Sequence, residues 1–504
     1  MGTKRQPVSH PDAPRNAVFF GGSAVNPADL MFRRRFSVNF YKTLRFRLCE
    51  MSMAKDFTRT NRGNPHPLLR ADGEREENVG GGVYRHSGGG TVRLLGMFFP
   101  YATYEMTVRE LCGEAGFAFF CPDEIKIALF RDGENCGLRF TSGGKRAEVP
   151  FEEIPEGPVR FVVSLRRSAV DVYLGGEEGG LRHAAGFDAP EMEISAREDV
   201  MKKSSSAVML RGAAVISGVG GYMDCGVSQA DIRPVRTEGG EVLVEGGRVW
   251  FTVSVRMQAE CYQGIFSWIP GTEEFEMTGA LFYDAGDGVW GNEVAASVLY
   301  DRNAKRWLVW VCAFSRGHIL GWASSPGDIR FGLNVLDITL VEKSGEDTPI
   351  EAFPGRKGDE DPDFRYLAVR NVWVMAVCRI AEGGYAYFFY ESKDPFRGYR
   401  FVGRTRGGSL TGGSFVDLGG ELYFVCGSER EEGKVDYRVY RYGDFERHGS
   451  LKCDHDDGGW RGWGTVFPVT LGTRRRIFWL TFDRDGASDY TWSYGNLYCF
   501  EADV

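Results

Sequence analysis

The sequence predicts an all-β protein in two parts: an N-terminal β-sandwich of the jelly-roll or concanavalin-like kind, followed by a five-bladed β-propeller. Three observations lead to this prediction. Glycine makes up 67 of the 504 residues, and short apolar, aromatic-rich patterns alternate with glycine-rich turns. All 11 tryptophans lie at or after Trp250, which divides the chain into two pieces of different composition. The second piece repeats one strand pattern five times.

The first piece, residues 1–228, is predicted to be the sandwich with an N-terminal extension. Its segments 159–163 and 169–173 alternate apolar and polar residues, as strands with one buried face do. Asp-Gly and Gly-Gly turns between such segments are typical of β-hairpins.

The second piece, residues 229–504, carries the repeat. Each copy starts at a turn and continues as an apolar strand around one aromatic residue, and a second aromatic strand follows. The central aromatic residues are 50 to 66 residues apart, which leaves room for several strands in each copy and is typical of propeller blades. Five copies predict five blades, centred on Trp250, Trp307, Trp373, Tyr423 and Phe478.

Charge and hydropathy exclude two classes of function. The net charge is −8 and the charges are interspersed, so the basic stripe expected of a nucleic-acid-binding protein is missing. The sequence has no apolar stretch of about 18 residues, so we expect no transmembrane helix and no membrane partner.

Cysteine and histidine patterns bear on compartment and cofactors. The 11 cysteines are irregularly spaced without a C-x-x-C pair, and residues 1–16 lack the apolar core of a secretory signal. Both features predict free thiols in a cytoplasmic protein. The seven histidines are scattered, so we expect no catalytic metal and no required cofactor. The acidic residues of the turn at 454–457 could bind a structural calcium ion through their oxygen atoms.

Three repeats carry a carboxylate at a similar distance before the aromatic strand. These are Asp231, Glu293 and Asp361. In a propeller the segments that enter the innermost strands line one mouth of the central channel, so we expect these carboxylates to converge there. Carboxylates that share a site have pKa values that spread apart, so an acid and a base coexist at neutral pH. Glycoside hydrolysis requires such a pair, whereas a solvated or turn-capping role is the alternative for each residue.

Further residues are candidates for substrate binding. Trp290 and Trp463 lie in glycine-rich segments and could stack on the apolar faces of sugars. Arg233 and Arg365 follow two of the acids and could bind hydroxyl groups or form structural ion pairs. Glu360 adjoins Asp361 and could face the same mouth.

Short motifs in the second piece resemble glycoside hydrolase family 43 and its relatives, which include the fructan-cleaving enzymes. Ala-Asp at 230–231, followed by a glycine-rich turn and an aromatic strand at 247–252, resembles the first blade of that family. The segment from Trp290 to Tyr-Asp at 300–301 is similar to the second blade, and Glu-Asp-Pro-Asp at 360–363 resembles the start of the third.

The resemblance implies a five-bladed propeller in which Asp231 is the general base and Asp361 orients or tunes the acid. The family's general acid is a glutamate at the start of the fourth blade, but here residues 411–414 read Thr-Gly-Gly-Ser. Either Glu293 or Glu360 would then supply the acid from another blade, or the chain is not a standard member of the family, or it has lost activity. Glu293 is the first choice because it lies at the start of its own blade.

The sequence therefore predicts a glycosidase that acts on an oligosaccharide, with a furanoside or pentose sugar suggested by the family resemblance. Asp231 would activate water, Glu293 would protonate the leaving oxygen and Asp361 would position the sugar. Inversion or retention at the anomeric carbon is open, as is assembly into a homo-oligomer. The alternatives are a catalytically silent carbohydrate-binding or scaffold propeller, or a transglycosidase or lyase on the same fold.

Overall fold

The structure is a computed structural model of the chain, and most of the sequence is described in it. The described residues are 25–38, 75–80, 82–121, 123–154, 157–176, 180–256, 260–341, 358–381, 383–406, 408–429, 435–454, 461–483 and 496–503.

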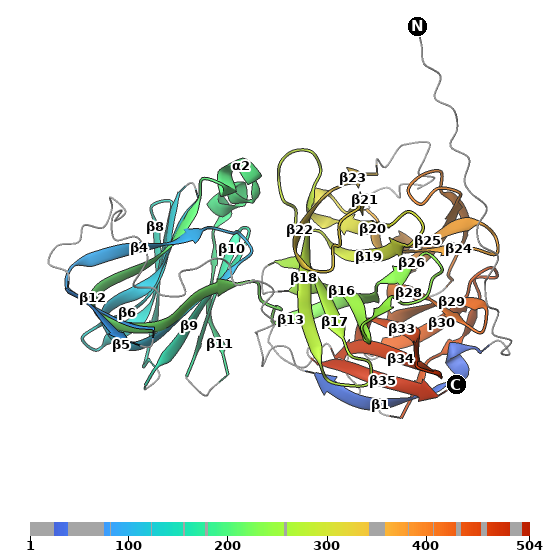
Figure 1. Cartoon of the computed structure of the whole chain (residues 1–504), viewed down its shortest axis with the longest axis horizontal. Helices are drawn as coiled ribbons and strands as arrows, with labels where there is room; N and C mark the ends of the chain where they lie inside the picture. Colours follow the sequence, from blue (N-terminus) through green and yellow to red (C-terminus); the bar gives the residue numbers. More distant parts are fainter. Residues whose placement is uncertain are drawn as a thin grey trace, which may run out of the picture.

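Five mainly antiparallel sheets form the blades of a β-propeller, as the sequence predicts (Figure 1). In each blade the chain runs back and forth from the centre to the rim. The innermost strands contact one another in a closed ring, blade one beside blade two and blade five beside blade one. The innermost strands are β13 (Ser228–Pro234), β19 (Val294–Asp301), β24 (Glu360–Leu367), β28 (Leu410–Leu418) and β33 (Arg461–Leu471).

The five repeated aromatic segments are confirmed as equivalent elements, because each one is the second strand of a blade. Their aromatic side chains pack in apolar clusters between neighbouring blades; Trp250 and Trp307 share one cluster, and Trp310 and Trp373 share the next. The second strands are β16 (Arg248–Arg256), β20 (Arg306–Ala313), β25 (Val372–Ala381), β29 (Glu421–Glu429) and β34 (Arg474–Asp483).

The outer strands complete each blade. The third strands are β17 (Cys261–Trp268), β21 (Ile319–Ser325), β26 (Gly384–Ser392), β30 (Val435–Arg441) and β35 (Leu497–Asp503). The fourth strands are β18 (Phe275–Asp284), β23 (Thr339–Leu340), β27 (Arg400–Arg404), β31 (Arg447–Ser450) and β1 (Met31–Val38). Short additions are β14 (Arg236–Thr237), β15 (Val244–Glu245), β22 (Gly332–Asp337), β32 (Lys452–Cys453), and the 3-10 turns η1 (Pro27–Asp29) and η4 (Phe314–Arg316).

The fourth strand of blade five comes from the start of the chain. Strand β1 pairs antiparallel with β35, which joins residues 31–38 to residues 497–503. Phe32 is fully buried there, with its ring edge-on to Trp479 at 5.7 Å. Strand β1 therefore pairs in the sheet of blade five, although its residues lie within 1–228, the range predicted for the sandwich and its extension. The division at residues 228/229 stays a prediction. The physical reason is that β35 leaves an edge that another strand must cover.

In the order of the chain, the N-terminal unit, residues 75–222, follows β1 and precedes the other strands of the propeller. It forms one branched sheet of 11 strands. Two 18-residue strands, β5 and β12, pair with each other at its centre, and Gly113 faces Gly212 near the middle of the pair. On its other edge, each strand pairs with one neighbour before this point and with a different neighbour after it. A Cβ at Gly113 would lie 2.0 Å from the Arg211 carbonyl oxygen, so the two backbones need glycine at this point. The sandwich stays a prediction for this unit.

The elements of the N-terminal unit follow in chain order. They are β2 (Arg75–Gly80), β3 (Val83–Ser87), β4 (Gly90–Met97), β5 (Thr103–Phe120), β6 (Glu124–Asp132), β7 (Asn135–Ser142), β8 (Lys145–Phe151), β9 (Val159–Arg166), β10 (Ala169–Gly175), β11 (Arg182–Asp188), η3 (Pro190–Ala196), α2 (Glu198–Met201) and β12 (Ser205–Tyr222).

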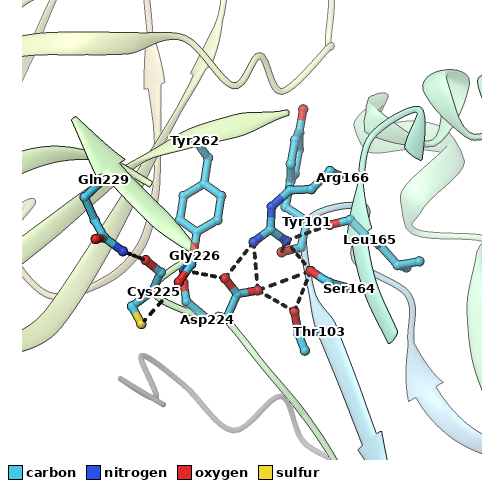
Figure 2. A network of polar contacts seen from close by, with 10 residues as sticks. All are labelled: Tyr101, Thr103, Ser164, Leu165, Arg166, Asp224, Cys225, Gly226, Gln229 and Tyr262. Atoms are coloured by element: carbon cyan, nitrogen blue, oxygen red, sulfur yellow. Dashed lines mark hydrogen bonds and ion pairs between the residues drawn. The ribbon is translucent and has the colours of Figure 1, made fainter. Parts of the chain in front are cut away.

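A buried ion pair ties the N-terminal unit to the propeller (Figure 2). Asp224, on the link between β12 and β13, accepts two hydrogen bonds of 2.7 Å from the Arg166 guanidinium on β9, and both side chains are fully buried. The hydroxyl of Tyr262, in blade one, donates to the Asp224 carbonyl oxygen. One residue of the link thus bonds to both parts of the protein.

The contact between the two parts continues beside the second blade. Phe99 and Tyr101 pack on Phe282 of β18, and the Tyr101 hydroxyl donates to the carbonyl oxygen of Trp290 (3.1 Å). Arg167 donates to the Asn292 side chain (3.3 Å). The segment that leads into β19 is therefore held by the N-terminal unit.

Replacing Phe32 tests the role of β1. Phe32→Ala removes a buried ring, and we expect it to lower the free energy of unfolding by about 3–5 kcal/mol, measured by urea denaturation. Arg33→Ala, at the exposed neighbouring position, is the control and should change it by less than about 0.5 kcal/mol. Equal effects of the two variants would contradict the placement of β1.

Breaking the buried ion pair tests the link. Asp224→Leu leaves the Arg166 charge buried without its partner, and we expect a loss of about 3–5 kcal/mol of unfolding free energy. The double variant Arg166→Met/Asp224→Leu buries no charge and should lose less than the single one. A double variant less stable than Asp224→Leu would show that the unpaired buried charge of Arg166 does not cause the loss of unfolding free energy in the single variant.

Candidate functional site

Every innermost strand contains a β-bulge at the same place. Two residues of the inner strand face one residue of the second strand, so the pairing shifts by one residue in all five blades. The two bulge residues are 231–232 in blade one, 295–296 in blade two, 361–362 in blade three, 412–413 in blade four and 463–464 in blade five.

The first bulge residue has a left-handed backbone in the first four blades. The φ angle is +53° at Asp231, +58° at Ala295, +50° at Asp361 and +58° at Gly412. Glycine adopts this conformation at the least cost, and aspartate tolerates it better than most other residues. Two of these positions nonetheless carry a buried aspartate, and strained polar positions of this kind cluster at functional sites.

The bulges place Asp231 and Asp361 at equivalent positions, but not Glu293. Glu293 lies two residues before Ala295, so it corresponds to Gln229 in blade one and to Asp359 in blade three. The predicted alignment of three carboxylates is therefore wrong for Glu293. The aspartates also lie within the innermost strands, whereas the sequence analysis placed them in segments that enter those strands.

Asp231 is connected to the bulge of the next blade. The Ser254 hydroxyl donates to Asp231 Oδ2 at 2.6 Å, and the same hydroxyl oxygen accepts a hydrogen bond from the Ala295 backbone N–H at 3.3 Å. Asp231 is 4% exposed. Its carboxylate is therefore oriented by blade one and blade two together.

Asp361, in blade three, is also bonded to the bulge of the next blade. Its Oδ2 atom accepts a hydrogen bond from the Gly412 backbone N–H at 3.3 Å, and its exposure is also 4%. Burial, followed by the charge of Asp231, raises the pKa of Asp361 to about 7. The two aspartates are therefore electrostatic neighbours, and near neutral pH the Asp361 carboxyl holds a proton about half of the time.

Arg233, which directly follows the bulge of blade one, bonds to the bulges of blades two and three. Its Nη1 atom donates to the carbonyl oxygens of Ala295 (2.9 Å) and Pro362 (2.8 Å), which are bulge residues of blades two and three. Its Nη2 atom lies 3.9 Å from Asp361 Oδ1. The side chain predicted to bind substrate thus holds the backbone around the aspartates and places a positive charge beside one of them.

The polar contacts that support the bulges were not predicted from the sequence. The backbone N–H of the second bulge residue is bonded by a side chain from the preceding blade's third strand: Ala296 by Gln263 (2.8 Å), Gly413 by Tyr387 and Gly464 by Tyr437 (3.0 Å). In blade three that residue is Pro362, which has no N–H to satisfy. Polar residues at this point of the aromatic third strands were the signal available in the sequence.

A second buried ion pair ties three blades together. Arg236 lies 3.3 Å from Asp363, whose carboxylate also accepts hydrogen bonds from Ser297 (2.8 Å) and the Phe415 backbone (2.7 Å). Arg236, on β14, and Ser297, on β19, belong to the sheet of blade two, Asp363 belongs to blade three and Phe415 to blade four. This pair fixes the inner strands below the bulges.

Glu293 is held by the loop that follows β20. The Ser315 backbone N–H donates to its Oε2 atom at 3.1 Å, the Ser315 hydroxyl donates to its Oε1 atom, and the Arg316 guanidinium lies 3.6 Å away. The side chain is 1% exposed, and this burial raises its pKa. Its role as the proton donor stays a prediction, but both of its oxygens have structural partners.

Glu360 lies next to Asp361 and remains accessible. Its side chain is 26% exposed, and its Oε1 atom is 3.1 Å from Nδ1 of His318. The ring edge of His318 meets Phe314, with centroids 4.5 Å apart. Glu360 is therefore a partly exposed carboxylate directly before Asp361 in the strand.

The remaining predicted residues lie elsewhere. Arg365 is further along β24, buried beside Gly240 and 3.4 Å from Asp417. Trp290 is half-buried against Phe99 of the N-terminal unit. Trp463 is the first bulge residue of blade five, and its side chain lies outside the described residues.

Most residues of the turn at 454–457, the predicted calcium site, lie outside the described part of the chain. Asp454 accepts a hydrogen bond from the Arg34 backbone (2.9 Å), so it supports β1, and residues 455–457 are outside the described residues. Within the described ranges, no three His, Cys, Asp or Glu side chains gather where they could hold a metal ion. Across the same ranges, no helix has the length and apolar character needed to span a membrane.

No protein-family model and no curated protein sequence matches the chain. Solved structures of similar fold include an inulosucrase from Halalkalicoccus jeotgali bound to kestose, with 13% identity, a TM-score of 0.39, and coverage of 55% of this chain and 85% of that one. A GH62 hydrolase in complex with xylotriose is 11% identical, with a TM-score of 0.37 and coverage of 55% and 91%.

A third similar structure belongs to family 43, which the sequence motifs resemble. It is a GH43 β-1,3-galactosidase with galactodeoxynojirimycin, 10% identical, with a TM-score of 0.36 and coverage of 54% of this chain and 94% of that one. The chain thus resembles structures of glycoside hydrolases.

The raised pKa of Asp361 predicts a pH dependence of stability. Because the folded state binds this proton more tightly than the unfolded state, whose pKa is about 3.9, the stabilisation is complete below about pH 4 and is lost as the pH rises through about 7. The difference in unfolding free energy between wild type and Asp361→Asn should therefore fall between about pH 4.5 and about pH 8, measured in urea. A constant difference would contradict the shift.

Proposed function

We propose that the chain is a glycosidase whose acid and base chemistry takes place at the bulges of blades one and three. The observation that carries the proposal is the pair of buried aspartates, Asp231 and Asp361, on strained, equivalent positions around Arg233. Two carboxylates in one site, with one pKa pushed to neutrality, are what hydrolysis of a glycosidic bond uses.

Asp231 is proposed as the general base. The Ser254 hydroxyl holds one of its oxygens, which fixes the carboxylate so that it can take a proton from a water molecule attacking the anomeric carbon. Asp361, protonated for part of the time, is proposed to donate a hydrogen bond to a sugar hydroxyl and so position the ring. A base mechanism gives a product with inverted anomeric configuration.

The substrate is proposed to be an oligosaccharide. A panel of arabinose-, xylose-, galactose- and fructose-containing oligosaccharides would identify its sugar. A furanoside or pentose remains the first expectation from the motifs at 230–231 and 360–363.

One observation favours a second candidate, a catalytically silent carbohydrate-binding propeller. The fourth innermost strand begins with Leu410, Thr411, Gly412 and Gly413, so it brings no carboxylate to the bulge. A silent protein would bind sugars of the panel without releasing product.

The test is reducing-sugar release from this panel by wild type and by Asp231→Asn. We expect the variant to lose at least about 100-fold in kcat/KM, because the base is removed while its shape is kept. Asp417→Asn is the matched control, since Asp417 lies beside Arg365 and away from the bulges, and it should keep wild-type activity. NMR of the first product should show inversion.

Three outcomes would go against the proposal. Activity that survives in Asp231→Asn would place the base elsewhere. Retention of anomeric configuration would make Asp231 a nucleophile or remove it from the mechanism. Binding of a sugar by calorimetry, with no release by wild type, would favour the silent protein.

A further inference from the structure

A cleft lies in the N-terminal unit, and all of its lining residues belong to that unit. It encloses about 1160 Å³ and is lined by residues 150–153, 174–176 and 180–184, at the end of β8 and at both ends of the connection between β10 and β11. Strands β8 and β11 are the last strands of two arms of the branched sheet, and both arms start from β5. Ligand sites in proteins typically enclose about 300–1,000 Å³, so this β8–β11 cleft has room for a chain of sugar-sized rings.

Part of the lining is apolar. Leu174 and Leu181 are buried there, and the ring of Phe151 is half-buried against the core of the unit. Within the described part of the chain, no other aromatic ring contacts Phe151. The exposed surface of this ring is therefore available to the apolar face of a ligand.

The lining also carries charged side chains. Glu152, Glu153 and Arg182 are exposed, and across the described ranges none of these three side chains forms an ion pair or a hydrogen bond. A carboxylate accepts hydrogen bonds from hydroxyl groups and a guanidinium donates to them, and such bonds are stronger than those between neutral groups. The cleft therefore offers acceptors and donors to a ligand rich in hydroxyl groups.

A fixed side chain and an uncovered backbone shape the walls of the cleft. Asp171 Oδ1 lies 3.1 Å from Nε2 of His183, and the rings of His183 and Tyr173 pack edge to face at 5.2 Å, so the imidazole is held in place. A Cβ on Gly180 would meet no atom within 4 Å. The space beside this glycine is therefore open, and a ring can approach its backbone closely.

We propose that the β8–β11 cleft binds a neutral oligosaccharide. A sugar ring has an apolar face of C–H groups, which packs on an aromatic ring, and hydroxyl groups, which bond to carboxylates and guanidinium groups. Phe151 serves the first kind of contact, and Glu152, Glu153 and Arg182 serve the second. The inference does not depend on the proposed function, because no residue of the propeller lines the cleft.

Other classes of ligand fit this lining less well. Two carboxylates against one guanidinium repel a polyanion such as a nucleic acid. A lipid chain would desolvate the three charged side chains without giving them partners. A basic peptide would suit Glu152 and Glu153, but it would bring more positive charge beside Arg182.

The test measures binding at the cleft itself by NMR. The full-length protein, labelled in its leucine methyl groups, is titrated with arabinose-, xylose-, galactose- and fructose-containing trisaccharides, and then with the peptide Gly-Lys-Gly-Lys-Gly. We expect at least one trisaccharide to shift the methyl signals of Leu174 and Leu181, with a Kd of about 1 mM or tighter. These two signals report the cleft directly, whatever binds at the propeller.

Variants of the lining separate the two kinds of contact. Phe151→Ala should weaken binding at least about fivefold, whereas Phe151→Tyr keeps the ring and should bind within about twofold of wild type. Phe401→Ala is the matched control, since Phe401 is 49% exposed on β27 of the propeller, and it should leave the Kd unchanged. The double variant Glu152→Ala/Glu153→Ala changes exposed side chains alone, so it should fold normally and still weaken binding at least about fivefold.

Three results would overturn the proposal. The first is that no trisaccharide shifts the two leucine signals. The second is that the shifts occur but the Kd is unchanged in both Phe151→Ala and the double variant. The third is that the lysine peptide shifts the signals and the sugars do not, which would assign the cleft to a basic peptide. A propeller without hydrolytic activity would overturn the proposed function and leave the sugar-binding cleft standing.

Discussion

The bulge in each innermost strand is the constraint on which the site depends. It turns two residues out of the hydrogen-bonded ladder, so their backbone N–H and carbonyl groups need other partners. Side chains of the preceding blade bond the N–H groups, and Arg233 bonds the carbonyl oxygens of Ala295 and Pro362. The same contacts close the ring and orient Asp231 and Asp361, so the architecture and the chemistry cannot be altered independently.

The N-terminal unit adds a second constraint. Its contacts with Phe282, Trp290 and Asn292 hold the segment between β18 and β19, which leads directly to Glu293 and the bulge of blade two. Asp224 fixes the link to β13, which leads to Asp231. Two of the five innermost strands thus begin from segments anchored in the N-terminal unit, which gives that unit a structural role at the site.

The sequence predicted the blades well because their second strands combine buried aromatic residues with flanking turns at regular intervals. It located Asp231 and Asp361 for the same reason, since both precede such a strand. It aligned Glu293 wrongly because the distance to the aromatic residue is not constant: blade one inserts β14 and β15 between its first two strands. The partner of β1 could not be foreseen, since a pairing with residues 497–503 leaves no local pattern.

Titration of the Asp361 carboxyl carbon by NMR, with Asp361→Asn for assignment, tests most directly whether the two aspartates share one site. The shared site predicts a midpoint near 7 in wild type, and a lower midpoint in Asp231→Asn because one of the charges that raises it is gone. A midpoint near 4, or one that does not move in Asp231→Asn, would contradict the shared site.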